Sequence, residues 1–473
     1  MTSGPSGPAG PALVSRRRML ARSGTGFGML GLASLLSGRS QAASGGELDT
    51  PAAGPQNPLH PLAPKPAHSR PRAKSVIFLF MNGGPSHVDT FDPKPALRRA
   101  AERKGLKGRR YMPSPFSFSP QGSSGIEVSE LYPHVSRSID DLTIARSMYT
   151  STPNHEPGLF MMNCGVQQPL RPSLGSWLCY GLGSENQNLP GFVVLCPGKP
   201  VVGPQLWSSS FLPGIFQGTH INNKSVDPEK VIPHLKGSGL GTGDQRRLLN
   251  ALQNLNREHL ARAGADNELE ARIESLEMAF RMQFEAQEAF DVSRETAATR
   301  ALYGEGAFAQ GCLLSRRLVE RGVRMVQLYY GAGQPWDAHG NIMDHRLDAA
   351  KSDQAIAALL TDLKSHGLLD ETLVLWGGEF GRTPTAQGGR GRDHHATGFT
   401  MWLAGGGVKG GYVHGATAEL GVDAIEKRTS VHDLHATILQ LMDVDDEQLV
   451  YRYSGRDFRL TDVHGRVMHD IIA

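Results

Sequence analysis

The sequence predicts an α/β fold in which a doubly wound, mainly parallel sheet is sandwiched between helices. Five short, almost purely apolar runs have the length of strands that are buried on both faces. They cover residues 75–81, 191–196, 323–330, 371–376 and 399–404. Helical patterns lie among the later runs, notably over 347–366 and 431–442. Strand alternating with helix is typical of an α/β sheet, which places its ligands at the carboxyl ends of the strands.

Residues 1–42 are typical of a twin-arginine signal peptide. They hold no acidic side chain, and Arg16 and Arg17 precede an apolar, glycine-rich stretch over 24–36 and small residues near Ala42. This pattern predicts export of the folded protein to the periplasm or the cell exterior. The alternative is a single membrane anchor, but the apolar stretch is shorter than the roughly 20 residues that a span requires. We therefore expect the leader to be cleaved, leaving no membrane span.

The rest of the chain divides into a linker and one large domain. Residues 43–72 are rich in Pro, Ala and Gly, which predicts a flexible linker outside the fold. Residues 73–473 then form the α/β domain. Inside it, residues 243–301 show apolar side chains at helical spacing among Arg, Glu and Gln, so we expect an inserted helical hairpin, broken near Gly264.

Charge and cysteine usage exclude several functional classes. The chain has 49 basic and 46 acidic side chains, and the leader accounts for five arginines and no acids. The remaining 44 basic against 46 acidic side chains give no reason to expect nucleic-acid binding. The four cysteines form no C-x-x-C pair, which argues against a zinc ribbon or a thioredoxin-like motif. Buried free thiols are favoured over a disulfide.

Polar side chains follow the predicted strands at the edge where a doubly wound sheet binds ligands. Carboxylates and imidazoles that meet there suit zinc, manganese or iron. A single histidine is more often structural, but clusters at several strand ends favour a metal site. A two-histidine, one-carboxylate iron site is an alternative, although it usually lies in a β-barrel. The candidate residues are Asn82, Asp337, His339, Glu379, Arg382, His394 and His395.

A further polar segment, residues 150–158, precedes a short apolar run with helical character. Thr152 lies where the positive end of a helix would help to activate a hydroxyl nucleophile. The alternative is ordinary helix capping by Thr152 or Asn154. His155 suits either a metal ligand or a general base.

Five longer segments carry a resemblance to a known family. They span residues 78–95, 313–331, 336–341, 368–384 and 391–411. Together they resemble exported sulfatase-like bacterial proteins known as domain of unknown function 1501, a branch of the alkaline phosphatase and sulfatase superfamily. The resemblance implies a parallel sheet between helices and a hydrolytic centre with one or two divalent metal ions, such as zinc, calcium or manganese.

By position, the resemblance assigns candidate metal ligands to this chain. Asn82 falls where the superfamily has its first metal-binding Asp, and Glu379 falls where an Asp-His-Gly motif usually stands. The central ligands match Asp337 and His339, and the late histidine matches His394 or His395. Relative to the superfamily, the neutral Asn82 removes one negative charge from the metal site. Phe380 stands where the His of the Asp-His pair is expected, so one nitrogen ligand is also lost.

The nucleophile motif of sulfatases, Cys or Ser followed by x-Pro-x-Arg, is absent from the sequence. Aligning Pro157 with the proline of that motif puts His155 at the nucleophile position and Leu159 at the arginine. The resemblance therefore does not extend to a formylglycine sulfatase.

The sequence supports two main hypotheses. The first is an exported, metal-dependent hydrolase of phosphate or sulfate esters, acting on a small molecule or a polysaccharide. In this hypothesis Asp337, His339 and His395 would hold the metal, and Glu379 and Asn82 would complete the site. His155 or Thr152 would act as base or nucleophile. Arg382 would pair with the anionic ester. The second is a catalytically inactive binding protein of the cell envelope. An iron-dependent oxidoreductase is a third class.

Overall fold

The computed structural model describes residues 61–66, 71–224, 242–263, 277–278, 280–282 and 285–473. The expected leader and Gly264 lie outside these residues. The chain divides into two units, and α8 (Thr242–Ala263) belongs to the smaller one. This helix covers the part of the expected hairpin that precedes Gly264, and the hairpin itself stays a prediction. The remaining elements discussed below belong to the larger unit.

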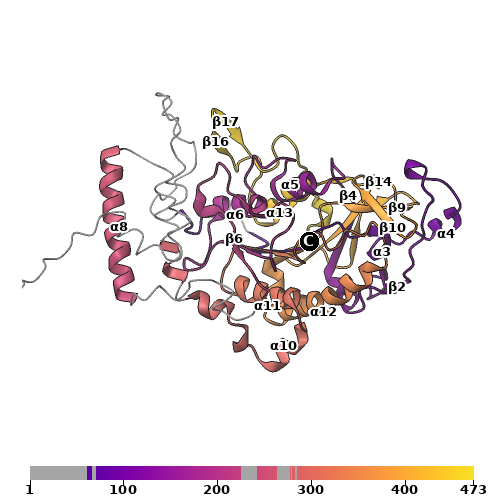
Figure 1. The fold of residues 1–473 in the computed structure, drawn as a ribbon, viewed down its shortest axis with the longest axis horizontal. Coiled ribbons are helices and arrows are strands. Elements are labelled where there is room, and N and C mark those ends of the chain that lie inside the picture. The colour runs from indigo at the N-terminus through magenta and orange to yellow at the C-terminus, as the bar shows by residue number, and fades with distance from the viewer. Residues whose placement is uncertain (1–60, 67–70, 225–241, 264–276, 279, 283–284) are drawn as a thin grey trace, which may run out of the picture. The chain divides into compact units, whose positions relative to one another are not determined.

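A nine-stranded sheet forms the centre of the larger unit (Figure 1). Its path runs β12-β4-β11-β8-β1-β7-β5-β6, and β15 also pairs with β4. Every pairing is parallel except those of β11, which runs against both of its neighbours, β4 and β8. The predicted mainly parallel sheet is thus confirmed. Its strands are β1 (Ser75–Phe80), β4 (Leu142–Tyr149), β5 (Phe192–Leu195), β6 (Thr219–Ile221), β7 (Met325–Tyr329), β8 (Thr372–Gly377), β11 (Phe399–Ala404), β12 (Tyr412–His414) and β15 (Thr429–Ser430).

Helices cover both sides of this sheet. Figure 1 shows α5, α6 and α13 on one side and α11 and α12 on the other. Because both faces are covered, every residue of β1, β7 and β8 is buried, as the apolar runs in the sequence predicted. The helices are α3 (His87–Thr90), α4 (Ala96–Ala100), α5 (His155–Cys164), α6 (Leu174–Leu182), α10 (Ala297–Tyr303), α11 (Ala307–Glu320), α12 (Asp344–Ser365) and α13 (Val431–Leu441).

Two-stranded sheets decorate the edges of the domain. The one that matters for function pairs β9 (Gly381–Gln387) with β10 (Gly391–His395) in antiparallel register, and it follows directly after β8. The others pair β2 (Phe118–Gln121) with β3 (Ile126–Ser129), β13 (Ala416–Thr417) with β14 (Ala424–Glu426), and β16 (Tyr451–Tyr453) with β17 (Arg456–Phe458).

Part of the expected linker packs against the domain. Leu62 is buried, its carbonyl accepts a hydrogen bond from the Ser184 amide, and the Lys65 amide donates to Leu182. These contacts differ from the expected tether outside the fold, because one large apolar side chain in a proline-rich segment is enough to anchor it.

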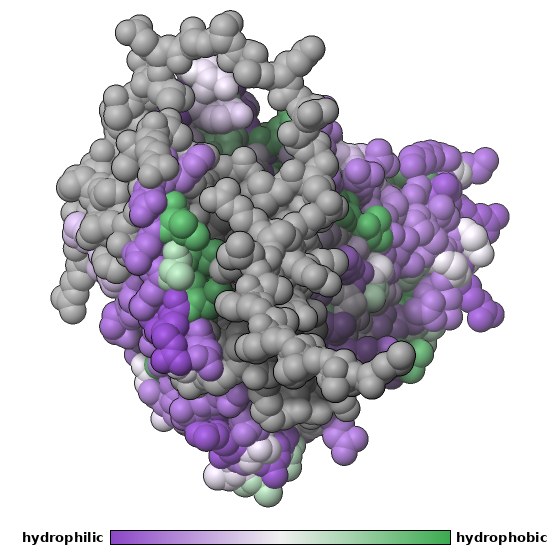
Figure 2. Space-filling view, turned by 60° about the vertical axis from the view of Figure 1, so that its left-hand side comes forward, coloured by the Kyte–Doolittle hydropathy of each residue, from purple (hydrophilic) through white to green (hydrophobic). Residues whose placement is uncertain are grey.

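The cysteines are buried as free thiols, and the described surface drawn in Figure 2 is mostly hydrophilic. All four cysteines are free and buried, which confirms the expected buried thiols. Burial raises the pKa of Cys164 and Cys179 to about 12. On the face drawn in Figure 2, the described residues are mostly hydrophilic, with apolar side chains in small groups. Among the described residues, no helix has both the length and the apolar character needed to cross a bilayer.

The lowered pKa values of three buried histidines predict that acid destabilises the fold. Burial lowers the pKa of His87 and His435 to about 4 and that of His345 to about 3. A histidine in the unfolded chain titrates near 6.5, so below that pH the unfolded state binds more protons than the folded state. The free energy of unfolding is therefore greatest above pH 6.5. It falls as the pH drops towards 4, by about 1 kcal/mol per pH unit for each histidine.

Urea unfolding midpoints on either side of pH 6.5 measure this loss. We expect His435→Gln to reduce the number of protons taken up on unfolding by about one, because the buried imidazole is gone. Glutamine can still donate to the Met162 carbonyl, which His435 contacts at 2.9 Å, so the variant should fold. His469→Gln, at an exposed position, is the control and should leave the slope unchanged. An unaltered slope in the His435 variant would contradict this account.

Candidate functional site

Four side chains from three parts of the chain meet at the carboxyl edge of the sheet. His155 is the first residue of α5, Asp337 and His339 lie in the loop after β7, and His394 lies on β10. One ligand atom of each residue lies within 4.8 Å of those of the other three. We call these four residues the His–Asp cluster. The parallel strands β1, β7 and β8 end at one edge, and this explains why segments so distant in sequence converge.

The imidazoles and the carboxylate are in close contact. His339 Nε2 lies 2.8 Å from His394 Nε2 and 3.0 Å from Asp337 Oδ1. His394 Nε2 lies 3.2 Å from the same oxygen, and His155 Nε2 lies 3.4 Å from Asp337 Oδ2. Nitrogen and oxygen lone pairs converging at such distances are the donor set of a metal site.

Neighbouring side chains fix how two of the imidazoles point. His155 Nδ1 lies 2.7 Å from Glu379 Oε1, and His339 Nδ1 lies 2.6 Å from Gln387 Oε1. Since these oxygens accept, each Nδ1 carries the proton and each Nε2 presents a lone pair to the cluster. His155 Nε2 is buried without a hydrogen-bond partner among the described residues. An orphaned acceptor of this kind fits a bound cation.

Electrostatics keep the central carboxylate charged. Burial acts to raise the pKa of Asp337, but His155, His394 and Arg382 outweigh it and hold the pKa far below its ordinary value. Burial lowers the pKa of His394, so this imidazole is neutral at neutral pH. For His155, burial opposes the charged form, but the carboxylates of Asp337 and Glu379 prevail and raise the pKa. Metal binding at Nε2 requires the neutral form of His155, in which Nδ1 keeps its proton and Nε2 carries none.

Glu379 lies behind the cluster instead of joining it. Its carboxylate is fully buried and accepts the Gly83 amide at 3.0 and 3.2 Å, in addition to His155. The carboxylate therefore orients a ligand, the arrangement found around many metal-bound histidines. The sequence-based assignment of Glu379 as a direct ligand does not fit this geometry, because its oxygens are already engaged.

Arg382 also serves the cluster from behind. It is fully buried, and its Nη2 donates to Asp337 Oδ1 at 2.5 Å and to the Gly83 carbonyl. Its Nε donates to the Gly84 carbonyl at 2.9 Å, and Nη1 faces the Arg392 carbonyl at 3.4 Å. With every nitrogen engaged, this guanidinium does not fit the expected role of pairing with an anionic ester.

Three other expected site residues lie outside the cluster. Asn82 is buried and donates to the carbonyls of Gly331 (3.0 Å) and Gly333 (2.5 Å), so it ties the end of β1 to the loop after β7. Thr152 Oγ1 accepts the Asn154 amide at 3.3 Å, which favours local capping over nucleophilic attack. His395 turns its Nε2 to the Val422 carbonyl and away from its neighbour His394.

Two residues of the site were not singled out from the sequence. Gln387 orients His339, and Phe380 packs its ring 4.9 Å from that of His155 and 4.7 Å from that of His394. A glutamine at the end of a strand carries no pattern that marks it. Phe380 was visible only as a departure from the family motif, and its apolar ring walls one side of the cluster.

Glycines bring the site loops into backbone contact. At Gly83, with φ of 113°, a Cβ atom would lie 2.6 Å from the Asp337 amide nitrogen. At Gly391, a Cβ atom would overlap the His339 carbonyl. A side chain at either position would push apart the segments that carry the ligands. The cluster is thus held by packed main chains as well as by side chains.

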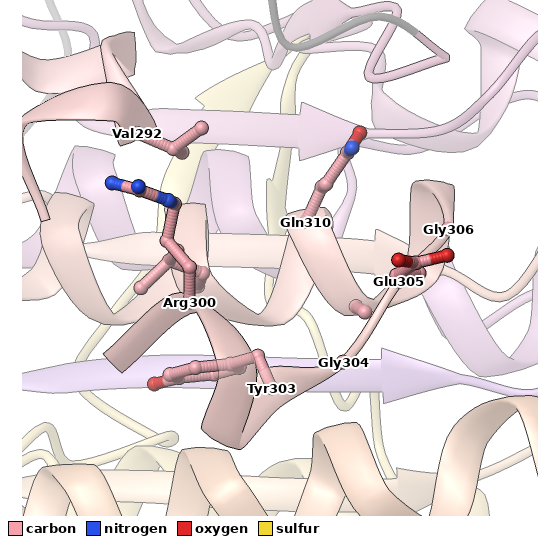
Figure 3. Close-up of a pocket in the computed structure, with 9 residues that line it drawn as sticks. Val292, Arg300, Tyr303, Gly304, Glu305, Gly306 and Gln310 are labelled. Carbon is pink, nitrogen blue, oxygen red and sulfur yellow. The ribbon is translucent and has the colours of Figure 1, made fainter. Parts of the chain in front are cut away.

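A separate pocket of about 350 Å³ lies between α10 and α11 (Figure 3). Arg300, Tyr303 and Gln310 are among its lining residues, none of which belongs to the His–Asp cluster. Arg300 donates to the carbonyls of Ser293 and Glu295, and Tyr303 donates to Asp362 at 2.7 Å. The guanidinium of Arg300 and the hydroxyl of Tyr303 are therefore already engaged within the fold.

Several solved structures show distant likeness to this chain. Ps i-CgsB in complex with k-i-k-neocarrahexaose is 11% identical over 80% of this chain and 74% of its own, with a TM-score of 0.38. The phosphonate monoester hydrolase SpPMH from Silicibacter pomeroyi is 11% identical (85% and 76% covered, TM-score 0.36). The PsFucS1 sulfatase from Pseudoalteromonas sp. is 13% identical (80% and 69%, TM-score 0.34).

Sequence comparison gives the family. No curated protein sequence matches the chain. One family model matches residues 73–472, which is nearly the whole domain expected from the sequence, and its description is "Protein of unknown function (DUF1501)". The protein is therefore a member of the DUF1501 family.

Proposed function

We propose that this protein is an exported, metal-dependent hydrolase of phosphate or sulfate esters. The observation that carries the proposal is the His–Asp cluster, in which the Nε2 atoms of three imidazoles converge on one carboxylate. Glu379 and Gln387 already orient two of these imidazoles, and Arg382 already holds the carboxylate. The family resemblance supports the reaction class, and the twin-arginine pattern supports export.

The donor set favours a transition metal. Three imidazole nitrogens and one carboxylate oxygen suit zinc, manganese or iron. Calcium takes six to eight oxygen ligands, so it does not fit this nitrogen-rich set. Among the described residues, this is the one group of such side chains close enough to share an ion. Phe380 lies against it where a further ligand would be needed, which favours a single ion over a pair.

A divalent metal held here would polarise the ester oxygen and lower the pKa of a bound water. The chain itself supplies orientation and charge. His155, His339 and His394 present lone pairs, and Asp337 supplies the anionic ligand, which Arg382 holds in place. Phe380 keeps water from one side of the cluster. The hydroxyl of Thr152 accepts the Asn154 amide, and no cysteine among the described residues joins the cluster; both observations favour water as the nucleophile.

The second candidate is a metal-containing binding protein without turnover. One observation favours it: the guanidinium of Arg382, expected to contact the ester, is fully engaged within the protein. A hydrolase needs a positive group at the substrate, supplied in our proposal by the metal. Retention of metal without hydrolysis of any ester in a broad panel would support the second candidate.

Adjacent histidines provide the first test. We expect His394→Gln to lose the metal, with at least a hundredfold weaker affinity, because an Nε2 ligand is removed. His395→Gln should keep it, because this side chain faces the Val422 carbonyl. Elemental analysis of purified protein and competition with a chromogenic chelator measure both. Equal metal content in the two variants would overturn the assignment, and thermal unfolding would show that both remain folded.

Hydrolysis of nitrophenyl phosphate and nitrophenyl sulfate provides the second test. Asp337→Asn keeps an oxygen for Arg382 but removes the anionic ligand, so turnover should fall by at least a thousandfold. Chelation should abolish turnover, and added metal should restore it. Full turnover in the metal-free enzyme would sink the proposed mechanism.

The role of Glu379 gives a third, separate prediction. Glu379→Gln weakens the acceptor that orients His155, so metal affinity should fall by about 10- to 100-fold. The matched control is Glu371→Gln, whose half-exposed carboxylate pairs with Lys74 at 2.8 Å. The control should bind metal normally. Unchanged affinity in the Glu379 variant would remove its positioning role, and turnover restored at high metal concentration would support it.

A further inference from the structure

A strongly basic segment follows α4. Residues 98–110 contain seven arginines and lysines and a single acid, Glu102. We call this stretch the basic segment; Figure 1 shows α4 and the chain after it at the edge of the domain beside β9 and β10. All of its cationic side chains are exposed except Arg109, which is half-buried.

The backbone fastens this segment to the strand that supports the site. Lys104 and Arg110 form a bridge, so the segment folds back on itself as a short loop. Its second arm then runs along β9, where the Ala386 amide donates to the Arg110 carbonyl at 2.9 Å and Tyr111 bridges Thr385. β9 also carries Arg382 and Gln387, which orient ligands of the His–Asp cluster.

Ion pairs with Asp393 form a second attachment of the segment, directly before the cluster residue His394. Lys107 and Arg109 each lie 2.7 Å from Asp393 Oδ2. The other oxygen of Asp393 accepts the amide of His394 at 2.9 Å. Two independent attachments thus place the basic segment directly beside the cluster.

The segment keeps a surplus of positive charge after its ion pairs are counted. Asp393, Glu102 and Glu419 neutralise some of its cations, by pairs such as Arg99–Glu419 at 3.2 Å. Seven cations against these three acids leave an excess of four. Arg98, Arg103 and Lys104 make no ion pair with a described residue. The chain after the leader has slightly more acidic than basic side chains, so this concentration is local.

We infer that the basic segment binds a polyanionic polysaccharide whose sulfate or phosphate esters reach the His–Asp cluster. This inference rests on the proposed function. While one ester occupies the cluster, the oxyanions of neighbouring sugar units contact the exposed cations. Arg382, the arginine behind the cluster, is not available to them, because it is fully engaged within the protein.

The segment does not have the features of a nucleic-acid site. Single-stranded nucleic acids are bound by stacking bases on exposed aromatic rings beside the cationic groove. The one aromatic side chain at the segment, Tyr111, packs its ring against Gly105. Exposed cations without a stacking surface suit a chain of sugar units bearing oxyanions.

The test compares polymer binding with small-ester turnover. The variant Arg98→Gln/Arg103→Gln/Lys104→Gln removes the three unpaired cations. We expect its affinity for size-defined heparin, measured by titration in about 0.1 M salt, to fall at least tenfold, and its salt dependence to weaken. A control variant, Lys199→Gln/Lys224→Gln/Lys351→Gln, makes the same charge change at exposed positions elsewhere. The control should retain the affinity of the native protein.

The outcomes separate this inference from the proposed function. Equal heparin affinity in both triple variants would overturn the inference, even if nitrophenyl esters are hydrolysed. Loss of affinity confined to the first variant would support it, even if the Asp337→Asn experiment shows no turnover to lose. Single-stranded DNA binding as tightly as heparin of equal charge would overturn the choice of polysaccharide.

Discussion

The ion pair between the buried Arg382 and the partly exposed Asp337 is the interaction on which the site depends. A guanidinium without exposure to water is stable only if its donors are satisfied, and here they reach a carboxylate and main-chain carbonyls. Two of these carbonyls, those of Gly83 and Gly84, belong to the loop after β1, and the carboxylate belongs to the loop after β7. A single side chain from β9 therefore joins the segments that follow three neighbouring strands. Removing it would take the guanidinium partner from Asp337 and remove one of the links between the two loops, which Asn82 also joins.

Much of the fold could be predicted because its central strands are buried on both faces. In β1, β7 and β8 this constraint produces apolar runs that leave little room for another interpretation. β4 escaped prediction because Arg146 and Ser147 interrupt its apolar character; the arginine reaches the Phe91 carbonyl at 2.8 Å. The reversed direction of β11 was equally hidden. Apolar composition records burial, and it does not record strand direction.

The candidate site could be predicted in its chemistry but only partly in its geometry. Asp337 and His339 follow a strand end, and this position sufficed to identify them. Choosing between His394 and His395 required knowledge of the bulge in β10, which decides which side chain faces the cluster. Arg382 is engaged by Gly84, a residue nearly 300 positions away in the chain. Glu379 lies behind His155, which is more than 200 positions away. No local spacing encodes such contacts.

The glycine contacts at Gly83 and Gly391 have a consequence for ion selection. Where main chains touch, ligand-bearing loops cannot spread or contract to suit the radius of the ion that enters. Flexible sites accept ions of several sizes, whereas rigid ones discriminate by fit. For an ion held by the His–Asp cluster, selectivity would thus be set in part by two residues that lack side chains. Enlarging either residue would alter which ion fits before it altered the identity of a single ligand.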